Sequence, residues 1–133
     1  MTTTNLVGHM EQLYAAYRDV LTELGLAEHR GALEAQELHR STVESATEQL
    51  RRAGLTVVDV ARDSFRMRFA DGRALLRHWF VRLAFVPGWR AVVPSGDADR
   101  VLAALEEHLD ALASRRGALE LIVPMACLTA ERR

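Results

Sequence analysis

Apolar side chains near the start of the chain recur at the spacing of a helix that buries one face. They occupy every third or fourth position from Met10 to Leu24, and Gly25 follows as a common helix stop. The full set is Met10, Leu13, Tyr14, Tyr17, Val20, Leu21 and Leu24. We therefore expect a helix here whose apolar stripe packs into the core.

Weaker signals predict two shorter helices before the first long strand. Segment 26–40 carries Leu33 and Leu38 and predicts a short helix. Ser41 followed by Glu44 predicts a capping box at the start of a helix of about three turns. The inner stripe of that helix is expected to be Val43, Ala46, Leu50 and Ala53, with Gly54 as its stop.

Two long segments carry the signals of β-strands. The β-branched run "LTVVDVARD" from Leu55 predicts a buried strand, which "SFRMRF" continues with strict alternation of apolar and basic residues. The segment "ALELIVPMACLTA" predicts a second strand, and Pro124 should lie at a bulge or face an edge because it donates no ladder hydrogen bond. The residues expected on one face of that strand are Leu119, Leu121, Val123, Met125 and Cys127.

Two helices are expected between these strands. Asp71 and Gly72 predict a turn, and a helix should follow until Pro87 and Gly88 break it. Its stripe is Leu75, Leu76, Trp79, Phe80 and Leu83, and that of a last helix closed by Gly117 is Val101, Leu102, Leu105, Leu109 and Leu112.

The element order predicts an α/β protein, or α+β as a stand-alone piece, in a single domain over residues 1–133. We expect a short mixed or antiparallel sheet of two to three strands packed with about five helices. A two-stranded ribbon is marginal in water, and its open edges invite another strand. A second copy of the chain, another protein, or the threonines Thr2, Thr3 and Thr4 would complete it.

Composition narrows the classes of function. The chain has 133 residues, of which 49% are hydrophobic and 26% charged, as in ordinary globular domains. Its 17 basic side chains balance 18 acidic ones, so no overall field favours nucleic acid or anionic lipid. No apolar run approaches the roughly 20 residues of a membrane span, and no signal-peptide pattern is present. We expect a cytoplasmic protein without a nucleic-acid or membrane partner.

Several chemistries lack their residues. All basic residues are arginine, which excludes a Schiff-base or P-loop lysine, and a GC-rich genome accounts for this bias more simply than function. The single cysteine, Cys127, allows no internal disulfide and is expected to be a small core residue. The histidines lack the spacing of a zinc helix, and the serines lack a nucleophile-elbow pattern. We expect no metal site and no serine hydrolase.

The order and spacing of three segments resemble the C-terminal half of class I S-adenosylmethionine-dependent methyltransferases, in the branch that includes the carrier-protein methyltransferase of biotin synthesis. "TTTNLVGHMEQLY" is similar to the end of the fifth strand with its loop and helix. "ESATEQLRRAGLTVVDVARDSFRMRFADGRALLRHW" resembles the helix, sixth strand and acceptor-side helix, and "ALELIVPMACLTA" resembles the seventh strand, which inserts antiparallel between the fifth and sixth. The resemblance implies that the cofactor-binding strands belong to a half that is absent from this sequence.

The residues that bind the cofactor in that family are missing here. The family uses a glycine-rich turn after its first strand and a carboxylate that holds the ribose. The eight glycines of this chain are scattered singly. The chain alone is therefore expected neither to bind S-adenosylmethionine nor to transfer a methyl group, and whether it is an enzyme depends on completion by a cofactor-binding half.

The resemblance leaves a set of candidate residues on the methyl-acceptor side, where loops and helices enclose the acceptor. His9 could exchange a proton with the acceptor, or it could be a loop histidine bonded to backbone. Independently of the resemblance, Arg66 and Arg68 flank Met67 and could contact an anion, or they could form the solvated face of a strand. The candidate acceptor-pocket residues are His9, Tyr14, Tyr17, His78 and Trp79, of which the tyrosines and Trp79 could instead be core.

Two hypotheses of different classes follow. The chain could be the acceptor-side part of a methyltransferase whose cofactor-binding half is separate. Alternatively, it could be a non-enzymatic module, derived from the same fold, that dimerises or binds a small ligand. Both expect an open sheet edge that takes up a partner, either a second copy of the chain or the cofactor-binding half.

Overall fold

The computed structural model describes residues 1–132 and contains three strands and seven α-helices. The elements are β1 (Thr2–Asn5), α1 (Glu11–Glu23), a 3-10 turn (Ala27–His29), α2 (Arg30–Glu37), α3 (Val43–Arg52), β2 (Leu55–Phe69), α4 (Gly72–Arg77), α5 (Trp79–Ala84), α6 (Val86–Arg90), α7 (Ser95–Arg116) and β3 (Leu119–Arg132). This confirms the α/β fold class.

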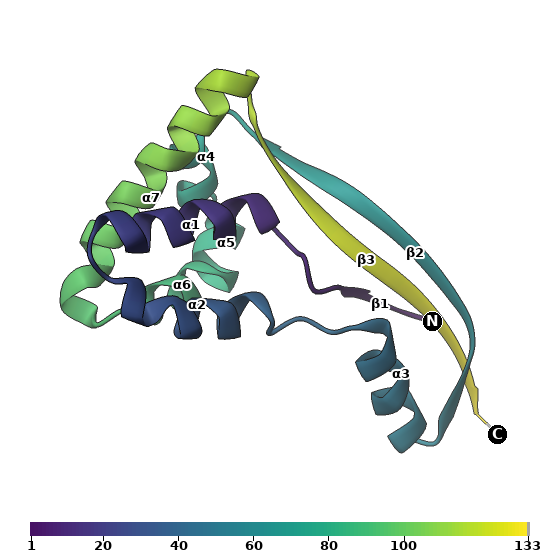
Figure 1. Ribbon diagram of the computed structural model, residues 1–133. Helices are drawn as coiled ribbons and strands as arrows, with labels where there is room; N and C mark the ends of the chain where they lie inside the picture. Colours follow the sequence, from purple (N-terminus) through teal and green to yellow (C-terminus); the bar gives the residue numbers. More distant parts are fainter. Residues whose placement is uncertain (133) are drawn as a thin grey trace.

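The strands form one antiparallel sheet in the order β1-β3-β2 (Figure 1). β3 is the central strand and pairs with β2 along nearly its full length, from Leu55 opposite Arg132 to Phe69 opposite Leu119. On its other side β3 pairs with β1, from Thr2 opposite Leu128 to Asn5 opposite Met125. The threonine segment therefore supplies the third strand, which is one of the three candidates expected to complete the sheet.

Helices cover opposite faces of the two ends of the sheet. At one end α1 and α7 pack on the face of β3 that carries Leu119, Leu121 and Val123, all fully buried. At the other end α3 packs on the opposite face against Ala126 and Leu128. Figure 1 shows this division: most helices lie at one end, and α3 stands apart beside the chain termini.

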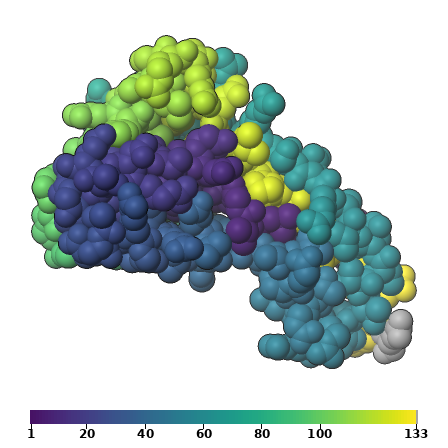
Figure 2. All heavy atoms as spheres, viewed as in Figure 1, coloured from purple at the N-terminus to yellow at the C-terminus, as the bar shows by residue number. Residues whose placement is uncertain are grey.

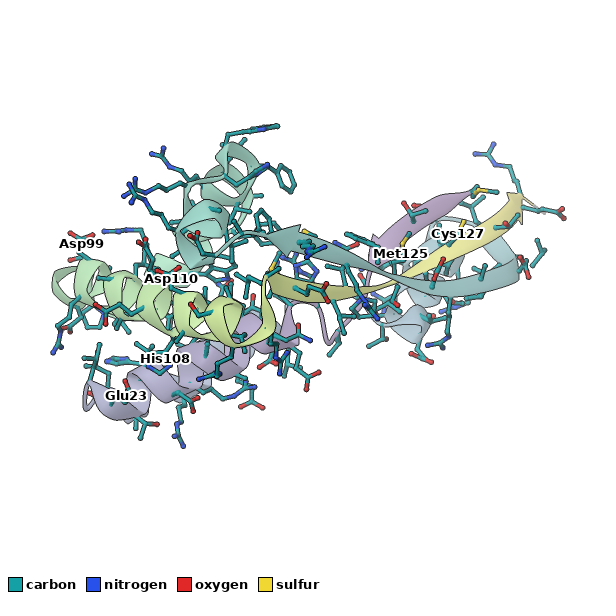
Figure 3. The ribbon with its side chains drawn as sticks, turned by 90° about the horizontal axis from the view of Figure 1, so that it is seen from above. Glu23, Asp99, His108, Asp110, Met125 and Cys127 are labelled. Atoms are coloured by element: carbon teal, nitrogen blue, oxygen red, sulfur yellow. The ribbon has the colours of Figure 1, made fainter. Side chains whose placement is uncertain are left out.

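The division explains why the expected apolar face of β3 is buried only in part. Met125 and Cys127 follow Val123 on the same face but are only half-buried, because α1 and α7 do not reach that far. Both side chains lie in the part of the sheet distant from α7 in Figure 3. The face assignment is thus correct, whereas burial ends at Val123.

The prediction of a buried strand from Leu55 is wrong for the middle of β2. β2 is one continuous strand with a register shift between Val57 and Asp59, and it forms an open edge of the sheet. Val58 and Phe65 are 53% and 41% exposed. A β-branched run reports strand propensity, and the helix layer that would bury it reaches only the two ends of β2.

The single helix expected over 75–83 is divided into α4 and α5. His78 adopts an extended conformation between them, with ψ 128°. This turn directs Trp79 and Leu83 into solvent, where they are 71% and 72% exposed. The buried tryptophan is instead Trp89, in α6, whose first turn contains Pro87. The core position expected for Trp79 is therefore wrong.

Smaller differences concern the shorter helices. The capping box at α3 is formed by Thr42 and Ser45 rather than by Ser41 and Glu44, because the chain reaches helical geometry one residue later. In α2 the inward residue is Leu33, while Leu38 is 54% exposed. The existence of α1, α2, α3 and α7 and the stop of α7 at Gly117 are confirmed.

Candidate functional site

The loop from β1 to α1 is shaped by hydrogen bonds of its own backbone. The Leu6 N–H donates to the Pro124 carbonyl, and the Val7 N–H donates to the Ser41 carbonyl. Pro124 has no N–H to return to Leu6, so the Leu6 carbonyl accepts the His9 N–H at 3.2 Å instead. The missing donor of Pro124 thus ends the β1 ladder and starts the turn. Pro124 lies in the central strand and at no register shift, so the expected position at a bulge or facing an edge is wrong.

Two left-handed residues complete this loop. Gly8 has φ +97°, and Met10 has φ +55° although it is not glycine. A bulky residue at positive φ is strained and persists only where its surroundings hold it. Met10 is fully buried, and its N–H donates to the Ile122 carbonyl at 3.0 Å. The loop is therefore a constrained turn that directs the His9 side chain inward.

The His9 imidazole is buried and has no hydrogen-bond partner. Only 2% of the residue is exposed, and neither ring nitrogen has a partner among the described residues. The ring stacks on Phe85 with centroids 5.4 Å apart. Burial, together with the nearby charge of Arg40, lowers the pKa of His9 from 6.5 to about 4. The imidazole is consequently neutral near pH 7, and the alternative of a histidine bonded to backbone through its ring is wrong.

Tyr14, Tyr17 and Trp89 extend this arrangement into an aromatic cluster, defined as His9, Tyr14, Tyr17, Phe85 and Trp89. The Tyr17 hydroxyl donates to the Trp89 carbonyl at 2.8 Å, and the Trp89 Nε1–H donates to the Tyr14 hydroxyl at 3.2 Å. Burial raises the pKa of Tyr17 to about 12 and also raises the pKa of Tyr14. Both phenols are thus neutral and anchored, as the core interpretation of the tyrosines expects.

His78 and Trp79 lie outside the aromatic cluster but are connected to it by ring contacts. His78 stacks on Trp79 at 6.1 Å, Trp79 meets Phe80 at 5.8 Å, and Phe80 meets Phe85 at 5.9 Å. Both His78 and Trp79 are exposed. The structure therefore brings His9, Tyr14 and Tyr17 together and places the other two candidates on the surface beside them.

Arg66 and Arg68 lie on the other side of the sheet. They pair in register with Ile122 and Glu120, which alternate with the helix-covered Leu121. Both arginines are exposed, and Arg66 forms a 3.7 Å ion pair with Glu120. This is the solvated face of a strand, and its arginines do not meet the aromatic cluster. An anion contact by Arg66 and Arg68 stays a prediction.

The outer edge of β1 borders two connected hollows that we call the β1 groove. One, of about 350 Å³, is lined by Thr3, Thr4, Asn5, His39, Arg40 and Ser41. The other, of about 270 Å³, lies between β1 and α3 and shares Thr3, Thr4 and Ser41 with the first. In Figure 2 the first residues of the chain lie in the angle between the helical body and α3. Arg40 connects the groove with the aromatic cluster, because it lines the groove and also lies over Phe85.

Arg40 is the residue that sequence patterns missed. Its guanidinium carbon lies 5.3 Å from the centroid of the Phe85 ring, and its Nε is buried without a hydrogen-bond partner. It precedes α3 in a connecting segment, one arginine among 17 basic residues, and no spacing singles it out. Phe85 and Trp89 were equally hidden, because Phe85 lies between two short helices and Trp89 lies in the second of them.

The residues of this site do not fit S-adenosylmethionine. The amides of Leu6, Val7, His9 and Met10 all donate within the protein, so the loop offers no cradle of free N–H groups. Neither part of the β1 groove is lined by a carboxylate that could hold a ribose. In residues 1–132 no group of three or more His, Cys, Asp or Glu is placed to hold a metal ion.

Comparison of the sequence with models of known protein families and with curated proteins finds no match. Among the helices of residues 1–132, none combines the length and apolar character needed to cross a lipid bilayer.

Proposed function

We propose that this chain is the acceptor-side portion of an S-adenosylmethionine-dependent methyltransferase and works only with a separate cofactor-binding portion. The observation that supports this most is the strand order β1-β3-β2, in which β3 runs antiparallel between two strands that are parallel to each other. The resemblance to class I methyltransferases implies the same order for their fifth, seventh and sixth strands. The expected cytoplasmic location belongs to this proposal.

The loop after β1 supports an acceptor-side role. Ligands of open α/β sheets bind beyond the carboxyl ends of strands, and His9 follows the carboxyl end of β1. A neutral imidazole offers one donor and one acceptor, and the surrounding rings exclude water from it. His9 would orient a polar atom of the acceptor if Phe85 moved aside, while Tyr14 and Tyr17 hold Trp89 behind it.

The alternative is a non-enzymatic module that dimerises or binds a small ligand. The exposed side chains of α5 favour it, since Trp79, Phe80 and Leu83 form an apolar surface that no element of residues 1–132 covers. The open edges of β1 and β2 could then pair with those of a second copy.

The deciding experiment measures binding of S-adenosylmethionine by isothermal titration calorimetry. The chain is tested alone and together with the polypeptide encoded directly upstream of it, if that polypeptide has a glycine-rich strand-turn-helix. We expect binding only by the combination. No binding by the combination, or no such upstream sequence together with a dimer of the chain alone, would favour the non-enzymatic module.

A further inference from the structure

Arg40 is a partly buried cation without a counter-ion. Arginines that bond to carboxylates elsewhere in the chain include Arg18, which bonds to Glu37 at 2.6 Å. Within residues 1–132 the other arginines that lack a carboxylate partner are all exposed, whereas Arg40 is half-buried. Its Nε makes no hydrogen bond, and its guanidinium lies over Phe85. The charge of an arginine in this position is not compensated by a carboxylate, so an anion that bound to it would be stabilised.

The β1 groove places hydrogen-bond donors beside this charge. The part of about 350 Å³ is lined by two threonines, a serine, Asn5, His39 and Arg40, and none of its lining residues is acidic. Hydroxyl and amide groups are donors suited to oxyanions, and a guanidinium binds them through two parallel N–H groups. The lining therefore matches an anion rather than a cation or an apolar ligand.

We infer that this part of the β1 groove binds an oxyanion group of a ligand, a carboxylate or a phosphate, with Arg40 as its counter-ion. Ser41 and Asn5 both line the groove, and Ser41 is held beside the end of β1 by its parallel bridge to Leu6. Arg40 would bind the anion, and the donors along β1 would orient it.

An anion site at Arg40 also indicates a class of methyl acceptor. If the chain is the acceptor-side portion of a methyltransferase, the acceptor carries an anionic group that Arg40 binds while its reacting atom lies near His9. This reading rests on the proposed function, whereas anion binding by Arg40 itself does not.

The test is a titration of the full chain followed by nitrogen-15 NMR of the arginine Nε–H groups and of the backbone N–H groups of the groove residues, which also report binding in variants that lack Arg40. Phosphate and acetate are the probes, added at constant ionic strength set with chloride. We expect the Arg40 Nε–H signal to shift and saturate with one of them in the millimolar range, which is ordinary for so small a ligand. The anion that saturates identifies the oxyanion as phosphate-like or carboxylate-like.

Three variants decide the role of Arg40. Arg40→Gln should weaken binding at least about tenfold, because a charge-assisted hydrogen bond is lost. Arg40→Lys should keep part of the affinity, since it retains the charge without the planar fork. Arg77→Gln, at an exposed arginine on α4, is the matched control and should leave binding unchanged.

A linear shift without saturation for both probes would overturn the inference, as would equal affinity of Arg40→Gln and the wild-type chain. If Arg40→Gln fails to fold, the wild-type titration and Arg40→Lys still decide it. Saturable anion binding without cofactor binding by the combined polypeptides would retain the anion site and reject the methyltransferase. Cofactor binding without saturable anion binding would retain the methyltransferase proposal and reject the anion site.

Discussion

At the scale of single residues, the main feature is a pair of buried polar groups that make no hydrogen bonds. The His9 imidazole and the Arg40 Nε both lack hydrogen bonds, and both contact Phe85. Buried polar groups of this kind cost stability, and in native proteins each calls for an explanation such as a ligand or water. The two groups are close enough for the charge of Arg40 to lower the pKa of His9. They therefore form one polar site within apolar surroundings.

His9 should make the stability of the chain depend on pH. Its pKa is about 4 in the folded chain and 6.5 without the fold, so between these values only the unfolded chain binds the proton. Stability should be unaffected by His9 above pH 6.5 and should fall as the pH is lowered toward 4, by up to about 2 kcal/mol at about pH 5. Urea unfolding at about pH 7.5 and about pH 5 measures this difference.

The matched variants for this prediction are His9→Leu and His39→Gln. Replacing His9 should flatten the pH dependence over this interval, whereas replacing the exposed His39 should leave it as in the wild-type chain. Equal slopes for His9→Leu and the wild-type chain would contradict the prediction.

Tyr17 should stabilise the aromatic cluster through its hydroxyl. Tyr17→Phe leaves the Trp89 carbonyl with only a long contact from the Val92 N–H at 3.4 Å. We expect a loss of about 1–2 kcal/mol in the free energy of unfolding, measured by urea titration. Tyr14→Phe should lose less, because its bond to Trp89 is longer at 3.2 Å. The reverse order would show that the Tyr17 bond is not the principal anchor.

At the scale of elements, the short helices between β2 and α7 shape the site. α4 begins where Asp110 of α7 accepts the Gly72 and Arg73 N–H groups, and Asp71 accepts the Ala74 N–H. Figure 3 shows Asp110 on α7. On another face of α7, His108 bonds to Glu23 at the end of α1 at 2.9 Å. The two contacts hold α7 against both neighbours.

Gly72 allows this close approach of α4 to α7. A Cβ at position 72 would lie 2.6 Å from Leu109 Cβ and 2.8 Å from the Glu106 carbonyl oxygen. Gly72→Ala should therefore destabilise the chain by about 1–3 kcal/mol, because backbone must shift. Gly96→Ala, where an added Cβ would meet no atom of another part of the chain within 4 Å, should be neutral or stabilising by a few tenths of a kcal/mol. Thermal unfolding followed by circular dichroism compares the two, and equal effects would refute the close contact.

Sequence patterns predict the long elements well and the short ones poorly, for a physical reason. α1 and α7 span several turns, so their apolar stripes repeat often enough to show the period. α5 and α6 have 6 and 5 residues, fewer than two turns, and a period cannot be read from so few positions. Phe85 and Trp89, two of the five residues of the aromatic cluster, lie in that region of weak signal.

At the scale of the whole molecule, the sheet has more exposed edge than its helices protect. The outer edge of β1 is covered only where Ser41 accepts the Val7 N–H, and β2 is open along its length. Whole-molecule burial is what the sequence could not predict: Leu55 begins a strand with the composition of a core strand, yet its middle faces solvent. Propensity depends on the residue, whereas burial depends on neighbours, including any partner.

The β1 edge should be the site of association. The ladder directs the Leu6 N–H toward β3, so by alternation Thr4 faces β3 and Thr3 faces outward. Thr3→Pro should leave the far-ultraviolet circular dichroism intact and abolish any complex formed through this edge, which sedimentation velocity measures. Thr4→Pro should destabilise β1 itself.

The control for this prediction is Arg66→Pro, which removes an outward N–H from the other open edge, β2. If Arg66→Pro abolishes association and Thr3→Pro does not, the interface lies at β2. If neither does, the sheet edges are not the interface.

Because Pro124 has no backbone N–H, it affects both the sheet and the loop that carries His9. Were a donor present at that position, the Leu6 carbonyl could join the ladder, and the turn that its bond to the His9 N–H closes would compete with a longer strand. The two arrangements share the Leu6 carbonyl, so lengthening β1 would weaken the bond that positions the buried His9. The proline in the central strand therefore determines where β1 ends, and through the turn that follows it determines where the His9 imidazole is buried.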